Sequence, residues 1–191
     1  MSLAALLLTF GMISAILPTG AVVPSAAIAV CFAPEDDCAG FATAAIDRAR
    51  RQILVDAYDL TTGSGIVSAL LRARARGVDI RLIADKRTPC ERKSGLAVLA
   101  SAGTPIWIDR SVPIAHAKVM VIDGALTLMG SYNWTRNAAR NSEDLNLVAS
   151  PALAAAYAVH WRHRLARSVP YTGRQDWCRP RRRRKLAARG G

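Results

Sequence analysis

The segment spanning residues 114–123 places an imidazole and an ammonium group two positions apart, at His116 and Lys118. If this segment is a β-strand, its side chains alternate between the two faces, so these two groups project to the same side. An imidazole can act as a nucleophile or carry a proton, and an ammonium group stabilises negative charge. The pair is therefore suited to chemistry on a small anion such as a phosphate. Asp123 has the opposite parity and lies at a turn, where it is better suited to holding structure than to contacting substrate.

A second polar segment, Gly130-Ser131-Tyr132-Asn133, comes seven residues after Asp123. By the same alternation Ser131 and Asn133 share one face, and Gly130 permits close backbone approach. A hydroxyl and an amide beside a histidine and a lysine could bind phosphate oxygens. Glu143 adds a carboxylate just before another expected strand.

Each of these features has an ordinary structural explanation when it is taken alone. A histidine near a strand is usually not catalytic, Gly-Ser is a common turn, and Asp-Gly is typical of a hairpin turn whatever the function. The joint spacing is what favours a site: His-x-Lys-x4-Asp, and then Gly-Ser-x-Asn.

The elements that must position these residues alternate between strand and helix over the first two thirds of the chain. Hydrophobic periodicity and turn residues predict strands at 28–32, 53–58, 78–84, 105–109, 118–122, 126–129 and 145–148. They predict helices at 41–51, 66–76, 94–102 and 151–167, the last capped by Ser150 and carrying an apolar stripe of Leu153, Tyr157, Trp161 and Leu165. This order predicts a one-domain α/β fold with a mixed, largely parallel sheet flanked by helices.

Composition allows one domain and indicates a polyanionic partner. The chain has 191 residues, of which 51% are hydrophobic, and its formal net charge is +12. Residues 174–191 contain eight basic residues and one acid. We expect a basic, Arg-rich and disordered tail over residues 171–191, which could bind nucleic acid or an anionic membrane surface, or could simply be solvated.

The N-terminal segment is uncharged up to Glu35, and residues 3–17 are almost continuously apolar. Prolines and small residues come next, as in the cleavage region of a secretory signal peptide, although no basic residue precedes the apolar stretch. We therefore predict that residues 1–27 are a signal peptide or a membrane anchor, and that the protein is exported to the periplasm or secreted.

Four cysteines allow three disulfide pairings. An even count in an exported chain suggests two disulfides, and the short loop favours Cys31–Cys38, which leaves Cys90–Cys178. The sequence contains no Cys-x-x-Cys pair, and His160-x-x-His163 lacks a nearby third ligand. We expect no metal and no cofactor.

The motif of His116, Lys118 and Asp123, together with Gly130 to Asn133, resembles the HKD signature of the phospholipase D superfamily. Residues 57–61, 76–80 and 102–106 resemble the elements before this motif in the small bacterial Nuc-type endonucleases of that superfamily, and residues 141–143 and 160–161 resemble the elements after it. The resemblance covers roughly residues 28–168 and implies a phospholipase D-like nuclease domain over residues 28–170.

In that family two HKD motifs meet in one active site, whereas this chain has one, so the resemblance implies a homodimer. His116 of one subunit would form a phosphohistidine and His116 of the other would protonate the leaving oxygen. Lys118 would stabilise the phosphoryl oxygens, and Glu143 would bind the far nitrogen of His116 and fix its tautomer. The candidate catalytic residues are therefore His116, Lys118, Asp123 and Glu143, and the candidate substrate-binding residues are Gly130, Ser131 and Asn133.

Three functions remain open from the sequence. A metal-independent, non-specific endonuclease is favoured by the small size, the single motif and the basic body of the chain. A phospholipase D that hydrolyses lipid headgroups would use the same chemistry. A non-enzymatic nucleic-acid-binding protein would work through the Arg-rich tail, but the intact motif disfavours it.

Overall fold

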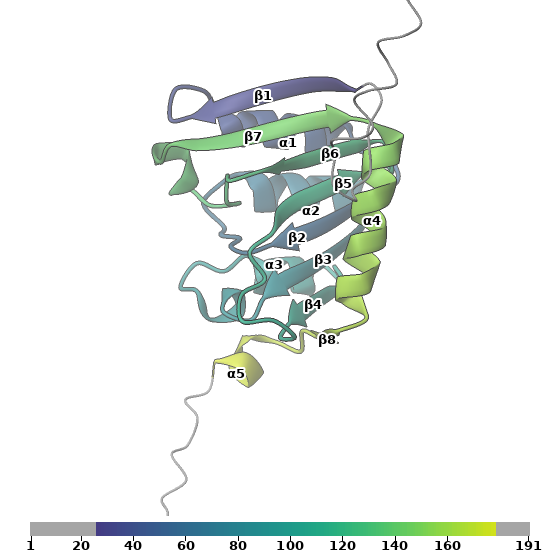
Figure 1. Ribbon diagram of the computed structural model, residues 1–191. Helices are drawn as coiled ribbons and strands as arrows, with labels where there is room; N and C mark the ends of the chain where they lie inside the picture. The colour runs from purple at the N-terminus through teal and green to yellow at the C-terminus, as the bar shows by residue number, and fades with distance from the viewer. Residues whose placement is uncertain (1–25, 179–191) are drawn as a thin grey trace, which may run out of the picture.

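A computed structural model describes residues 26–178 of the chain, which fold around one eight-stranded sheet (Figure 1). Its strands are β1 (Ala27–Ala33), β2 (Gln52–Ala57), β3 (Asp79–Asp85), β4 (Ile106–Asp109), β5 (Lys118–Ile122), β6 (Leu126–Gly130), β7 (Glu143–Ala149) and β8 (Ser168–Pro170). The helices are α1 (Cys38–Arg48), α2 (Ile66–Ala75), α3 (Leu96–Ser101), α4 (Pro151–Leu165) and α5 (Arg174–Trp177), with short 3₁₀ helices at Thr88–Cys90 and Ala138–Arg140. The strand order is β1-β7-β6-β5-β2-β3-β4-β8.

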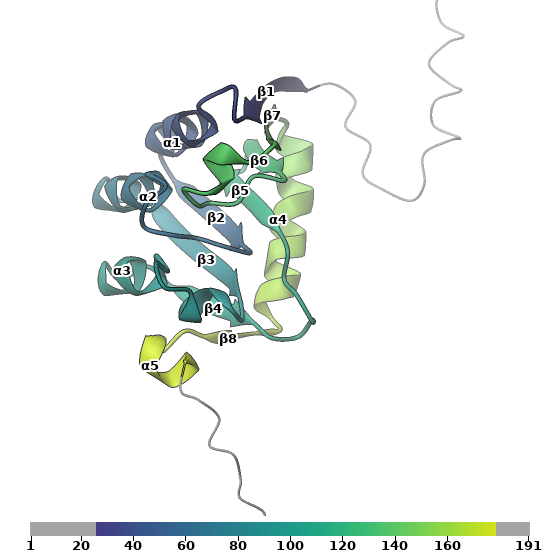
Figure 2. The same cartoon turned by 90° about the vertical axis from the view of Figure 1, so that its left-hand side faces the viewer.

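The molecule has three layers, with α1, α2 and α3 on one face of the sheet and α4 on the other (Figure 2). This arrangement confirms the predicted single α/β domain with a mixed sheet flanked by helices. The expectation of a largely parallel sheet was wrong, because among the strands of residues 26–178 only β2–β3 and β3–β4 pair in parallel. Helical crossovers join these three strands, whereas the β1–β7, β2–β5, β4–β8, β5–β6 and β6–β7 pairings are antiparallel.

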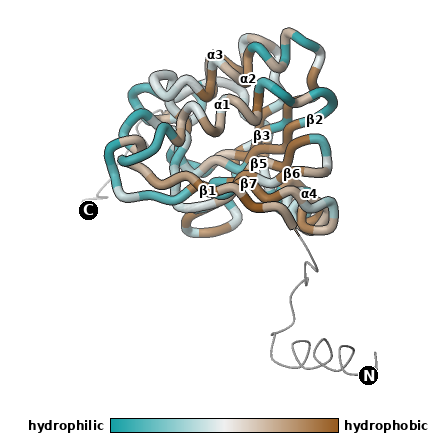
Figure 3. Tube along the Cα trace, turned by 90° about the horizontal axis from the view of Figure 1, so that it is seen from above, coloured by the Kyte–Doolittle hydropathy of each residue, from teal (hydrophilic) through white to brown (hydrophobic). Residues whose placement is uncertain are grey.

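Each face of the sheet buries its own apolar cluster, and the hydrophobic residues gather along the strands and the helix faces that meet them (Figure 3). On the α1–α3 face Val78, Ile80, Leu82 and Ala84, which alternate along the strand expected at residues 78–84, are all buried. On the other face Trp161 of α4 packs with Leu54, Ile83 and Val121, and Tyr157 and Leu165 join them, while Ala154 takes the place expected for Leu153.

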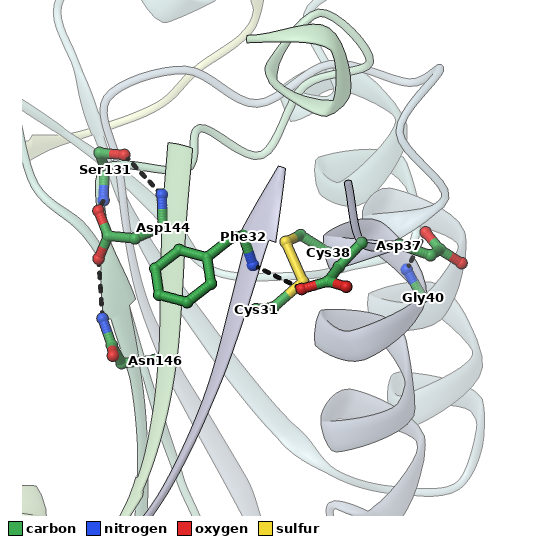
Figure 4. Close-up of a disulfide and its surroundings, with 9 residues drawn as sticks. Cys31, Phe32, Asp37, Cys38, Gly40, Ser131, Asp144 and Asn146 are labelled. Atoms are coloured by element: carbon green, nitrogen blue, oxygen red, sulfur yellow. Dashed lines mark hydrogen bonds between the residues drawn. A yellow bond between two sulfur atoms is a disulfide. The ribbon is translucent and has the colours of Figure 1, made fainter. Parts of the chain in front are cut away.

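Helix α1 begins three residues earlier than the sequence predicted. Asp37 caps it, with its carboxylate accepting a hydrogen bond from the Gly40 amide at 2.8 Å. The disulfide between Cys31 and Cys38 ties the first residue of the helix to β1, as Figure 4 shows. The favoured pairing of these two cysteines is confirmed, and so is the Ser150 cap of α4, which accepts from the Leu153 amide at 3.2 Å.

The predicted hairpin of β5 and β6 is present and turns at Asp123 and Gly124, both of which have positive φ. The positive φ of a non-glycine residue is accommodated best by Asp or Asn. Since β5 lies in the middle of the sheet, between β6 and β2, the hairpin fixes the position of the residues that precede it.

The C-terminal part of the domain extends further than expected. Residues 171–178, assigned from the sequence to a disordered tail, include α5, and Cys178 forms the predicted disulfide with Cys90. Residues 1–25 and 179–191, and with them most of the predicted signal or anchor segment and of the Arg-rich tail, lie outside the described residues. Among the helices between residues 26 and 178, none is both long and apolar enough to cross a bilayer.

Candidate active site

Six of the seven residues proposed from the sequence line one pocket, at the sheet edge where β5 begins and β6 ends. These residues are His116, Lys118, Gly130, Ser131, Asn133 and Glu143. Asp123 is not among them, because it lies beyond the opposite end of β5. The four side chains of His116, Lys118, Ser131 and Asn133 thus share a pocket, as predicted, but His116 precedes β5 and Ser131 and Asn133 follow β6, so strand alternation does not position all of them.

Strand pairing holds the motif in place. Lys118 pairs with Ala57 of β2, and the Tyr58 amide donates to the Ala117 carbonyl at 2.8 Å, so the β2–β5 ladder continues past the strand end toward His116. Gly130 pairs with Leu145 of β7, and a Cβ atom there would overlap the backbone carbonyl of Asp144. The close approach that the sequence predicted at Gly130 is thus an approach to a neighbouring strand.

His116 is exposed, whereas Lys118 is buried with its ammonium group directed at the histidine. The Lys118 Nζ atom lies 3.0 Å from both ring nitrogens of His116 and donates to the His116 carbonyl oxygen at 2.9 Å. Accessibility suits an imidazole that must meet a large substrate, and burial suits a cation whose field should not be screened by water.

The surroundings lower the pKa of both groups. Removal of the Lys118 ammonium from water lowers its pKa, and the carboxylates of Glu143 and Asp59 partly offset that effect. Desolvation also lowers the pKa of His116, together with the positive charges of Lys118 and Arg87. A lowered pKa keeps the imidazole neutral near pH 7, which is the form that a nucleophile requires.

Glu143 does not pair with His116 in the single chain, contrary to the role expected from the resemblance. Its carboxylate accepts hydrogen bonds from the Ser131 hydroxyl at 2.5 Å and from the Asn141 side-chain amide at 3.0 Å. The Asp144 amide in turn donates to the Ser131 hydroxyl at 3.0 Å. Glu143 therefore holds the Ser131 and Asn141 side chains in this structure and adds negative charge beside Lys118.

The structure adds an aromatic wall that the sequence analysis did not assign to the site. The ring of Tyr58 lies 4.3 Å from that of His116, centroid to centroid, and the Lys118 Nζ atom lies 4.8 Å from the Tyr58 ring centroid. Arg87 donates to the Tyr58 hydroxyl at 2.5 Å and to the Asp85 carboxylate at 3.1 Å. Asp85 also accepts from the Ala115 amide at 2.7 Å, so it anchors the segment just before His116.

Two further polar groups beside the pocket have incomplete hydrogen bonding. The Asp59 Oδ1 and Asn133 Oδ1 atoms are buried and have no hydrogen-bond partner among the described residues. Burial and the nearby Glu91 carboxylate raise the pKa of Asp59. Since an unpaired buried oxygen costs free energy, these atoms are placed to accept hydrogen bonds from a ligand or from water.

Asp123 has a structural role, and the geometry removes it from the catalytic set. Its carboxylate accepts hydrogen bonds from the backbone amides of Arg50, Arg51 and Gln52 at 2.9, 2.8 and 3.0 Å. Burial works to raise its pKa, but these three hydrogen bonds and the Arg51 charge lower it. Asp123 thus fastens the turn between α1 and β2 to the hairpin, as its strand parity suggested.

A second cavity, of about 210 Å³, lies on the α4 side of the same sheet edge and also borders His116. Asp56 of β2 lies on it, and burial raises the pKa of this carboxyl to about 7, with the Arg164 charge opposing and the Asp109 charge adding to that shift. His160 lines this cavity and not the pocket of Lys118. His160 and His163 are 6.4 Å apart between ring centroids, and no group of three possible metal ligands occurs among residues 26–178.

Comparison with known proteins places this geometry in a family. Residues 43–165 match the family model described as "Cardiolipin synthase, PLD-like domain". A phospholipase D from Rickettsia bellii is 35% identical over 142 residues, which cover 74% of this chain and 70% of the relative. A mitochondrial cardiolipin hydrolase from Chlamydomonas reinhardtii is 32% identical over 97 residues, or 50% of this chain and 44% of that protein.

The fold gives the same answer. The crystal structure of Nuc from Salmonella typhimurium, described as a phospholipase D family member, superposes with a TM-score of 0.73 at 32% identity, over 77% of this chain and 99% of Nuc. The sheet, the pocket and these relatives define a phosphodiester hydrolase. The chain belongs to the phospholipase D superfamily, in agreement with the resemblance found in its sequence.

Proposed function

We propose that this protein is an endonuclease that cleaves phosphodiester bonds without a metal ion, through a phosphohistidine intermediate. The observation that carries the proposal is the meeting of His116, Lys118, Ser131 and Asn133 at one exposed pocket. These groups provide a nucleophile, a cation and two hydrogen-bonding side chains for a phosphate. The high net charge of +12 favours a polyanionic substrate.

In the first step the neutral imidazole of His116 attacks phosphorus, forming a P–N bond as the P–O bond to the leaving alcohol breaks. Lys118 stabilises the negative charge that accumulates on the non-bridging oxygens. A protonated imidazole must deliver a proton to the leaving oxygen. In the second step the imidazole that donated this proton, now neutral, takes a proton from a water molecule. The water oxygen attacks phosphorus, the P–N bond breaks, and His116 is released.

A second imidazole is therefore required, and we assign it to His116 of a second copy of the chain. The pocket that contains Lys118 holds one histidine, and His160 faces the neighbouring cavity instead. A twofold axis through the exposed pocket would supply a second His116 and a second Lys118 together. The two imidazoles would begin in different protonation states and titrate as a coupled pair.

Export from the cytoplasm is part of the same proposal. Both disulfides, Cys31–Cys38 and Cys90–Cys178, are of the kind that persists in oxidising compartments. The apolar, uncharged N-terminal segment fits a secretory signal or an anchor. We place the active protein in the periplasm or outside the cell.

A phospholipase is the second candidate, since the matched relatives are named phospholipase D and cardiolipin hydrolase. Incubation of the purified protein in EDTA with plasmid and, separately, with phosphatidylcholine or cardiolipin vesicles separates the two functions. The proposal predicts nicked plasmid and intact lipid. Release of choline or phosphatidic acid with intact plasmid would establish the lipase, and activity that requires added Mg²⁺ would refute metal independence.

The shared site has its own test. Sedimentation of the active protein should give a dimer, and refolding the wild type with an equal amount of the His116→Asn variant should give less than half the activity of the wild type alone, because each mixed dimer has a single His116 in its shared site. A monomer under conditions of full activity would refute the shared site without affecting the assignment of His116.

A further inference from the structure

The cavity on the α4 side of the sheet is a second opening beside the catalytic histidine. Its volume is about 210 Å³, and it lies at the carboxyl ends of β2, β3 and β4. One wall comes from residues 112–117, which lead into β5, and another from His160 and Arg164 of α4. His116 borders both this cavity and the pocket of Lys118. A substrate whose phosphate lies in that pocket can therefore reach the cavity with the group next to the phosphate.

Asp56 lines this cavity with a carboxyl group that has no partner. The residue is 9% exposed, and its side chain forms no hydrogen bond and no ion pair with any residue between positions 26 and 178, although its backbone carbonyl accepts from the Trp134 indole at 3.2 Å. Strand alternation turns the side chain toward α4, on the same side as Leu54. A buried carboxyl group without a hydrogen bond costs free energy in either protonation state, so this position favours a ligand that completes the bonding.

The other two carboxylates of the cavity already have partners. Asp109 accepts from the Nε atom of Arg164 at 2.8 Å, and this pair fastens α4 to the end of β4. Asp85 accepts from the Ala115 amide at 2.7 Å and so holds the segment before β5. These two groups therefore build the walls, and Asp56 is the carboxyl group that is left for a ligand.

The remaining lining is largely aliphatic and includes Ile83, Val112 and Ile114. None of the residues between positions 26 and 178 that line the cavity is Phe, Tyr or Trp, so it lacks the aromatic faces that bind a quaternary ammonium group such as choline. At about 30 Å³ for a group the size of a water molecule, the cavity holds about seven non-hydrogen atoms, close to one pyrimidine ring. A ligand that fits it has one small ring and an N–H donor.

We propose that this cavity binds the cytosine base of a nucleotide next to the scissile phosphate, with the Asp56 carboxyl group accepting a hydrogen bond from the cytosine amino group. Among the nucleobases cytosine combines a single ring with an amino donor, and a carboxylate is a known acceptor for that group. Uracil and thymine have a carbonyl oxygen at the same place and cannot donate to Asp56 there. The inference rests on the proposed nuclease function and specifies the nucleotide at which it cuts.

The substrate strand must be open at the bound nucleotide. In a duplex the cytosine amino group is paired with the other strand and the ring is stacked, so the base has to leave the helix before it can enter a cavity. We therefore expect single strands to be cleaved faster than a closed duplex of the same sequence. Equal rates on the two would contradict binding of the base in the cavity.

The first experiment compares bonds within one strand. The substrate is a single-stranded oligonucleotide of deoxyuridine with one central deoxycytidine, cleaved by the full chain in EDTA and mapped on a sequencing gel. The bonds that flank the deoxycytidine should be cleaved about tenfold more often than the others, because the two bases differ by the amino group that Asp56 accepts from. Since all bonds compete in the same strand, this ratio does not depend on how much of a variant is folded.

Asp56→Asn should bring the ratio close to one, because an amide can donate to uracil as well as accept from cytosine. The matched control is Asp47→Asn, the same chemical change on α1, which covers the opposite face of the sheet (Figure 2). Asp47 forms an exposed ion pair with Arg72 at 2.7 Å, and its variant should keep the wild-type ratio. An unchanged ratio for Asp56→Asn, or the same fall in both variants, would overturn the role of Asp56.

The wild type alone separates this inference from the proposed function. Cleavage that is uniform along the strand would overturn the base cavity and leave the nuclease function in place. A wild-type protein that cuts no bond of the strand would overturn the nuclease function itself.

The second experiment measures binding without cleavage. Deoxycytidine phosphorylated on both sugar hydroxyls should inhibit cleavage of an oligonucleotide about tenfold more strongly than the matching deoxyuridine compound, and Asp56→Asn should remove the difference. Val112→Phe, which narrows the cavity and leaves Asp56 in place, should also bring the two inhibition constants together by excluding both bases. Constants that still differ in the Val112 variant would contradict binding in this cavity.

Phosphoethanolamine, the headgroup of a phospholipid, is tested as an inhibitor in the same assay. It should inhibit more weakly than the deoxycytidine compound and equally in the wild type and Asp56→Asn. If it inhibits as strongly as the deoxycytidine compound and depends on Asp56 in the same way, the cavity binds an ammonium headgroup and the assignment to a base is wrong.

Discussion

The two ends of strand β5 carry parts of the same sequence motif but differ in how their polar groups are satisfied. At the Asp123 end the carboxylate accepts three backbone amides, and its pKa is lowered by them against the effect of burial. At the Lys118 end the ammonium is buried, its pKa is lowered by that burial, and the neighbouring Asp59 and Asn133 oxygens have no partner in the described chain. One end of the motif thus holds the fold together, and the other leaves polar groups free to bind a ligand.

The largest effect on activity should come from a change at the Lys118 end of β5. His116→Asn removes the nucleophile and should lower kcat on a phosphodiester by at least about 10³-fold, while the melting temperature stays near that of the wild type because the side chain is exposed. Steady-state rates and thermal unfolding measure the two quantities. In the wild type, kcat/KM should fall on acidification through a pKa below 6.5, because the neutral imidazole attacks. Near-normal activity of the pure variant would contradict the mechanism.

A change at the Asp123 end of β5 should have the opposite result, a loss of stability with activity retained. Asp123→Ala leaves the amides of Arg50, Arg51 and Gln52 without an acceptor and should reduce the free energy of unfolding by about 3 kcal/mol, with kcat of the folded protein retained. The folded-state pKa is lowered, so this stabilisation is present above the unfolded pKa of about 4 and is lost as the pH falls below it. Urea unfolding at pH 7 and pH 3 measures the difference, which should shrink in acid. A loss of kcat without a loss of stability would return Asp123 to the catalytic set.

Asp56 lies at the same edge of the sheet as Lys118, but on the α4 side. Burial raises the pKa of Asp56 to about 7 in the folded protein, compared with about 4 in the unfolded chain. The free energy of unfolding therefore decreases as the pH rises from about 4 to 7. Asp56→Asn should therefore stabilise the protein at pH 8, by on the order of 2 kcal/mol, and have little effect at pH 4. Unfolding free energies at the two pH values test this. An Asn variant that is less stable at pH 8 would show that the charged carboxylate has a stabilising partner.

The smallest effect should come from Ser131, which lines the same pocket as His116 and Lys118. Ser131→Ala removes one hydroxyl that binds Glu143 and Asp144 and should lower kcat/KM about tenfold, with little change in the melting temperature. Ser131→Thr keeps the hydroxyl and should recover most of the activity. If Thr is as impaired as Ala, the hydroxyl is not the group that matters.

Local sequence signals predicted what local chemistry determines. The Asp-Gly turn indicated the β5–β6 hairpin, Ser150 indicated the start of α4, and the two-residue spacing of His116 and Lys118 indicated that they share a pocket. The short spacing of Cys31 and Cys38 favoured one disulfide, and the second, Cys90–Cys178, followed by elimination.

The features that the sequence did not reveal depend on contacts between distant strands. Tyr58 and Arg87 reach His116 only because β2 and β3 end at the same edge as the start of β5, and no local pattern encodes that registry. The available sequence signal for these site residues was the polar pair Tyr58-Asp59, which comes directly after a buried strand. The direction of the outer strands also depends on how long connections pack in the folded chain. The sequence does not show this packing, so the sheet was expected to be more parallel than it is.

The close contact between Gly130 and strand β7 has a consequence for how the active site tolerates change. A single methyl group at this position would collide with the Asp144 carbonyl, which also accepts the amides of Ser131 and Tyr132. The distance between the β6 and β7 backbones therefore helps to set the distance between the Ser131 hydroxyl and the His116 imidazole. A larger residue at position 130 would push β6 away from β7. The pocket residues would then be displaced although their chemical groups stay the same.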